Sequence, residues 1–100
     1  MITIVPIELE GGTAIGTALA LPKTTVLSIS TQKGYIMCGV LNVPEVDRIL
    51  SERKVIAAKV VGVKKIEDLL DAKVVEATNE AKSIGVREGM TGREALEKMF

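Results

Sequence analysis

The stretch Gly34-Tyr35-Ile36-Met37-Cys38-Gly39-Val40-Leu41 contains the central strand of the fold that the sequence predicts. Its apolar side chains point to both faces of an extended strand, a pattern typical of a strand that is covered on both sides. Residues before this stretch alternate with the period of a strand, and most residues after it follow the period of a helix. We therefore predict an α+β domain in which Tyr35–Leu41 is a central strand.

The first 44 residues predict a mainly antiparallel meander of four strands. Alternating apolar residues mark strands at residues 1–10, 13–21 and 24–31, ahead of the central strand. Pro6 has no N–H to donate to a ladder, so we expect the first strand at a sheet edge. Small residues share one smooth face of the second strand, which another backbone can approach closely: Ala14, Gly16, Ala18 and Ala20.

The second half predicts helices around one further strand. Pro44 suits the first turn of a helix that ends near Arg53 and Lys54. Val55–Val63 is almost entirely apolar, so we expect a fifth, interior strand that is parallel to the fourth. Further helices are expected at residues 65–70, at residues 73–84 and after Thr91, whose spacing from Glu94 is that of a capping box.

The predicted order of elements is therefore β-β-β-β-α-β-α-α-α in one domain, residues 1–100. Residues 1–44 are β-rich, and residues 45–100 are expected to be mainly helical with one strand near 55–63. The five strands should form one mixed sheet, with helices on one face and a partner subunit on the other.

Composition narrows the function classes. The net charge is zero and only two residues are aromatic, which argues against a nucleic-acid partner. We expect neither a membrane span nor a signal peptide, and the single cysteine suits a reducing cytoplasm. Abundant Glu and Lys with scarce Asn and Gln are typical of thermophilic proteins.

Charge is distributed unevenly along the chain. In residues 1–44 it is confined to four positions: Glu8, Glu10, Lys23 and Lys33. A sheet with so little charge exposes apolar surface unless something covers it. A second copy is the simplest cover, so we predict a homo-oligomer built through the N-terminal strands. The alternative is a monomer whose own helices hide both faces.

Histidine is absent, which removes the usual general base and the commonest zinc ligand. Cys38 is the candidate nucleophile or redox thiol, because ligands bind near the carboxyl ends of strands in open α/β sheets. Gly39 would let a ligand approach the backbone. The alternative is that Cys38 is a packed hydrophobic residue. Lys64 and Lys65 precede a helix and are candidates to hold a phosphate or carboxylate, or they are solvated charges.

Three stretches together resemble the YunC-like family, a bacterial and archaeal domain of unknown function. They are residues 34–39 (GYIMCG), 62–72 (GVKKIEDLLDA) and 85–96 (GVREGMTGREAL), and the Leu21–Thr24 junction fits as well. The resemblance implies an N-terminal β-region that mediates tetramerisation. It implies no activity and transfers no catalytic residue.

The sequence therefore predicts a small cytoplasmic homo-oligomer that binds a small ligand near Cys38 and the Lys64–Lys65 loop. One alternative is an enzyme that uses Cys38 as nucleophile or redox thiol. Another is a scaffold or regulatory subunit that binds a different protein. We expect no cofactor and no metal.

Overall fold

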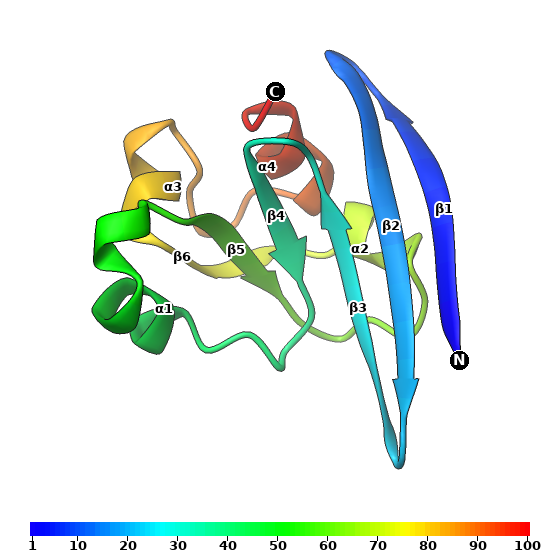
Figure 1. The fold of residues 1–100 in the computed structure, drawn as a ribbon. Coiled ribbons are helices and arrows are strands. Elements are labelled where there is room, and N and C mark those ends of the chain that lie inside the picture. Colours follow the sequence, from blue (N-terminus) through cyan, green and yellow to red (C-terminus); the bar gives the residue numbers. More distant parts are fainter.

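The structure, a computed structural model, describes residues 1–100 with the exception of the Ser51 side chain. Within the described residues, six strands lie side by side in one sheet, in the order of the sequence (Figure 1). The strands are β1 (Ile2–Leu9), β2 (Gly12–Leu21), β3 (Thr24–Ser30), β4 (Gly34–Met37), β5 (Ile56–Val60) and β6 (Val74–Ala77). The helices are α1 (Val43–Ile49), α2 (Asp68–Asp71), α3 (Asn79–Ser83) and α4 (Gly92–Glu97), with a 3-10 turn η1 (Ser51–Arg53) after α1.

The predicted α+β class and N-terminal meander are confirmed. Strands β1 to β4 pair antiparallel, and β1 with Pro6 lies at the sheet edge. Strands β4 and β5 pair in parallel, as expected from the connection between them, and β6 pairs antiparallel with β5.

The prediction of a helix at residues 73–84 is wrong for the first part of this range. Residues Val74–Ala77 form the sixth strand, and only Asn79–Ser83 are helical. Thr78 separates the two elements, because its buried hydroxyl donates to the carbonyl of Val55 and accepts from the N–H groups of Ala57 and Ala81. The sequence has helical spacing here, but pairing with β5 satisfies the buried backbone groups of residues 74–77 instead.

Three other elements are shorter than expected. β4 ends at Met37 rather than Leu41, because the Cys38 carbonyl accepts from Leu41 N–H and the chain turns. β5 ends at Val60, two residues before Gly62, whose φ of 78° is in the left-handed region. The helix expected at residues 65–70 begins only at Asp68.

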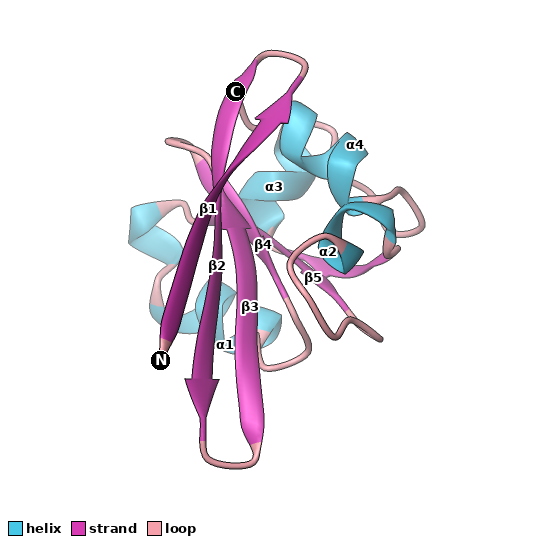
Figure 2. Ribbon diagram, turned by 90° about the vertical axis from the view of Figure 1, so that its right-hand side faces the viewer, coloured by secondary structure: helices cyan, strands magenta, loops and turns pink.

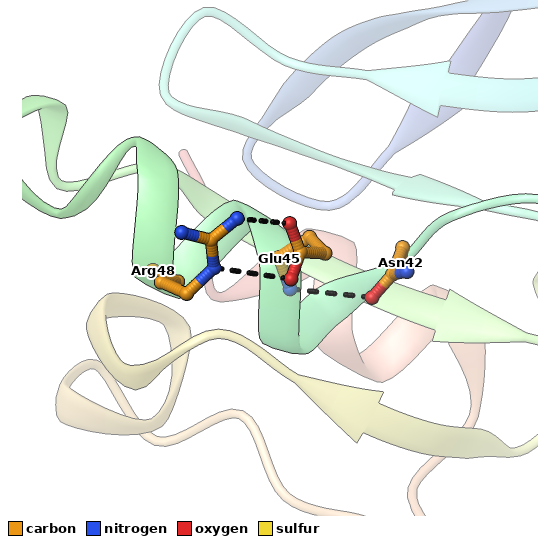
Figure 3. Close-up of polar contacts among 3 residues, drawn as sticks. All are labelled: Asn42, Glu45 and Arg48. Atoms are coloured by element: carbon orange, nitrogen blue, oxygen red, sulfur yellow. Dashed lines mark hydrogen bonds and ion pairs between the residues drawn. The ribbon is translucent and has the colours of Figure 1, made fainter.

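The start of α1 follows the sequence signals (Figure 3). The side chain of Asn42 accepts from the N–H of Glu45 at 3.2 Å and so caps the helix. Pro44 lies in the first turn, as predicted. Arg48 pairs with Glu45 one turn earlier, with 2.6 Å between Nη2 and Oε2.

Helices lie on both faces of the sheet, which corrects the expectation that they cover one (Figure 2). α2 and α4 cover the face that carries the main core, where Ile29, Ile36 and Leu96 are fully buried. α1 lies on the opposite face, where Val43 packs with Ala57 and Tyr35. Apolar residues of β4 and β5 thus need cover on both faces, and α1 supplies it on the second.

The chain itself covers the first half of the smooth face of β2, whereas Ala18 is half-buried and Ala20 is exposed. Ala14 and Gly16 are buried, and a Cβ added to Gly16 would lie 2.7 Å from Cγ2 of Ile66. The close approach expected at this face is therefore made by the side chain of Ile66. The large exposed apolar side chains of β2, Ile15 and Leu21, lie on the opposite face.

Candidate functional site

Cys38 lies one residue beyond β4, at the carboxyl end where the sequence placed it, but its side chain is only 7% exposed. Its N–H donates to the carbonyl of Leu27 at 3.0 Å, which continues the β3–β4 ladder by one residue. The N–H of Leu27 donates to Sγ of Cys38 at 3.4 Å. The thiol is thus packed in the main core and engaged as an acceptor, so a reacting molecule would have to displace this contact.

Gly39 is exposed and lies beside Val61, the residue after β5. The carboxyl ends of the parallel strands therefore meet, as expected. Lys64 and Lys65 follow within the same loop, and their side chains are exposed. Their backbone N–H groups donate to Oδ2 of Asp68 at 3.0 and 3.2 Å. A carboxylate of the chain itself thus occupies the amides that were candidates to hold an anion.

Surface hollows lie away from these residues. One of about 160 Å³ lies between α1 and α3, and one of about 260 Å³ lies beside Phe100. Among the described residues, no group of three or more His, Cys, Asp or Glu is placed to hold a metal ion. A ligand at Gly39, Lys64 and Lys65 stays a prediction.

The most prominent surface feature is the side of β1–β3 that faces away from the main core, called here the open face. Four of its side chains are large, apolar and exposed: Ile2 at 62%, Ile4 at 65%, Ile15 at 44% and Leu21 at 45%. Leu19 and Val26 on the same face are half-buried. Isolated apolar residues are common on protein surfaces, but neighbouring ones on adjacent strands form a patch, and patches mark interaction sites.

The strand register places these residues in rows across the sheet. Ile2 lies opposite Leu19, which lies opposite Val26. In the next row Ile4 lies opposite Thr17, and Thr17 opposite Ser28. These rows hold no charged residue, so the open face combines apolar side chains with small hydroxyl groups.

The open face has clear borders. At one end, Glu8 accepts a hydrogen bond from the Thr13 hydroxyl at 2.9 Å. At one side, α1 borders the open face. It packs over Tyr35, which lies opposite Ser30 on the neighbouring strand. Burial there raises the pKa of the Tyr35 hydroxyl. The scarcity of charge in residues 1–44 predicted apolar surface on these strands. Ile2 and Ile4 were missed, although their positions alternate with the inward Val5 and Ile7.

Comparison with known proteins shows which family the chain belongs to. Residues 37–99 match the model of a family described as "Domain of unknown function (DUF1805)". The chain belongs to the DUF1805 family. It is 41% identical over 100 residues to "Uncharacterized protein YunC" of Bacillus subtilis (strain 168), and the match covers all of this chain and 99% of that protein. The resemblance to the YunC-like family is thereby confirmed.

The fold of this DUF1805 protein is similar to that of a solved structure. That structure is the crystal structure of a protein of unknown function, TA1206 from Thermoplasma acidophilum. The TM-score is 0.88 and the identity 36%, over all of this chain and 94% of the other. The family match begins at Met37, so the open face lies in the part of the DUF1805 chain that precedes it. Within the described residues, no helix has the length and apolar character needed to cross a membrane.

Proposed function

We propose that this DUF1805 protein works as a homo-oligomeric module whose subunits associate through the open face of β1–β3. The observation that carries this proposal is the exposure of Ile2, Ile4, Ile15 and Leu21 on one uncharged face. Burying apolar surface is favourable by roughly 25 cal/mol per Å². A face without charges suits a partner that is itself uncharged and apolar, and the same face on a second copy meets that requirement.

The assembly that we propose is a tetramer, in line with the resemblance to the YunC-like family. A pair joined through the open face is its basic unit. Because Cys38 is packed and the Lys64–Lys65 amides are occupied, we place assembly ahead of catalysis as the role of this domain.

The test is the oligomeric state of matched variants by native mass spectrometry at micromolar concentration. Ile15→Lys introduces a charge in the middle of the open face and should convert the oligomer to monomers. Ile84→Lys is the control, because Ile84 is also an exposed isoleucine, at 37%, but lies at the end of α3 away from the open face. Ile84→Lys should leave the oligomer intact. A wild-type protein that is monomeric would refute the proposal, and so would an Ile15→Lys variant that assembles like the wild type.

A further inference from the structure

The open face, the sheet edge and α1 together restrict how two copies can meet. We infer that two subunits pack face to face, with β2 of one copy lying over β2 of the other in the same direction and each α1 flanking the partner's β1 edge. This inference rests on the proposed self-association and adds its geometry. It follows from three features of the subunit, considered in turn below.

The first feature is the edge of β1, which is poorly suited to pairing. Ala20 N–H donates to the Met1 carbonyl, so Met1 and Ala20 are a hydrogen-bonded pair. Such pairs alternate along an antiparallel ladder, and the outward backbone groups of β1 therefore belong to Ile2, Ile4, Pro6 and Glu8. Pro6 lacks the N–H that a neighbouring strand would need in the middle of this edge. Continuation of the sheet from copy to copy across β1 is thus disfavoured, and the face is left as the contact.

The second feature is the size of the open face. Three strands of about eight residues span roughly 26 Å by 14 Å, which is a flat footprint of about 360 Å² per copy. Two such footprints total about 700 Å² of flat area, and stable interfaces bury about 1,200 Å² or more of accessible surface. An interface through the strands alone is therefore small, and a neighbouring surface that adds contact area is favoured.

The third feature is α1, which supplies that surface. It stands on the same side of the sheet as the open face, over β4 and β5 (Figure 2). A helix is about 10 Å across, and two packed sheets lie about 10 Å apart. A second sheet that lies on β1–β3 therefore meets α1 side-on.

The position of α1 also selects the symmetry axis. A two-fold axis that runs parallel to the plane of the sheet and perpendicular to the strands would make α1 of each copy clash with the partner's β4 and β5. A two-fold axis along the strands, above β2, places each α1 just outside the partner's β1 edge instead. With this axis, Thr17 at the centre of the open face lies across from Thr17 of the partner subunit. Aligned sheets of this kind cross at about −30°, so the contact is closest near the centre.

Cross-linking at single introduced cysteines tests this geometry. Thr17→Cys should give a covalent dimer with a short bis-maleimide that spans the gap of about 10 Å between packed sheets. Thr3→Cys is the matched control, because Thr3 is exposed on β1 but belongs to the opposite side of the sheet. It should give no dimer. The wild type, which keeps the buried Cys38, provides the background for both variants.

The outcomes separate this inference from the proposed function. Cross-linking of Thr3→Cys but not Thr17→Cys, with the oligomer intact by native mass spectrometry, would indicate edge pairing and overturn the face-to-face geometry alone. An intact oligomer in which neither variant cross-links would also overturn it. If Thr17→Cys does not assemble, Leu19→Cys replaces it, because Leu19 lies on the same face of β2 and this axis places each such β2 residue across from its own copy. A monomeric wild type, or one whose open face binds a different protein, would refute both proposals.

Discussion

At the scale of single residues, Cys38 combines two properties that are easily confused in a sequence. Its position after β4 is that of a ligand-binding residue in open α/β sheets. Its environment is that of a core residue, because the thiol takes the place of a ladder carbonyl and accepts the N–H of Leu27. The position could be predicted from the strand pattern. The environment depends on how the Cys38 side chain packs against β3, which the strand pattern does not specify.

Alkylation of Cys38 distinguishes these two roles. We expect iodoacetamide to label Cys38 slowly in the folded protein and at the rate of a free thiol once the protein is unfolded, because thiolates react only where the reagent can reach them. The measurement is the extent of labelling by mass spectrometry over time, with and without denaturant. Rapid labelling of the folded protein, with a midpoint well below pH 8.5, would instead support a nucleophilic thiol.

At the scale of elements, α4 is held by its cap. Thr91 accepts from the N–H of Glu94 at 3.1 Å, and Glu94 accepts from the N–H of Thr91 at 3.0 Å. This capping box was predicted from spacing alone and is confirmed. The hydrogen bond from the Thr91 N–H, followed by the one from its hydroxyl, holds the pKa of Glu94 below its ordinary value.

This lowered pKa gives a pH dependence of known sign. The folded protein binds a proton at Glu94 less readily than the unfolded chain does. The stabilisation is therefore present above the unfolded pKa of about 4.3 and is lost as the pH falls through the lower folded pKa. Glu94→Gln keeps an oxygen acceptor but cannot titrate. We expect the urea midpoint of the wild type to fall more steeply than that of Glu94→Gln between about pH 5 and pH 3. Parallel curves for the two proteins would contradict this.

The sixth strand, β6, could not be predicted from the local sequence pattern. Residues 73–84 have apolar spacing that fits a helix, yet Val74 and Ala77 are buried as strand residues against β5. The alternating pattern that would indicate a strand was weak, since β6 has only four residues. Tertiary pairing decided the outcome, because β5 has a free edge whose buried backbone groups need partners.

At the scale of the whole molecule, stability should depend on assembly. If the folded subunits associate and the unfolded chains do not, mass action raises the thermal midpoint with protein concentration. We expect the wild-type midpoint to rise by several degrees over about a hundredfold range of concentration. The midpoint of Ile15→Lys should be lower and independent of concentration. Scanning calorimetry or circular dichroism measures both, and a wild-type midpoint that does not move would contradict the prediction.

Local patterns in the sequence were enough to predict the α+β class, the N-terminal meander, the parallel β4–β5 pair, the cap of α4 and the position of Pro6 at the sheet edge. Each of these depends on neighbouring residues, through period, spacing or a missing N–H, so a local pattern contains the information. The folded structure was needed to show that Cys38 is packed, that Asp68 occupies the Lys64–Lys65 amides, and that α1 leaves β1–β3 uncovered on one face. These outcomes depend on which distant segments compete for the same surface, and that competition is settled only when the sheet is complete.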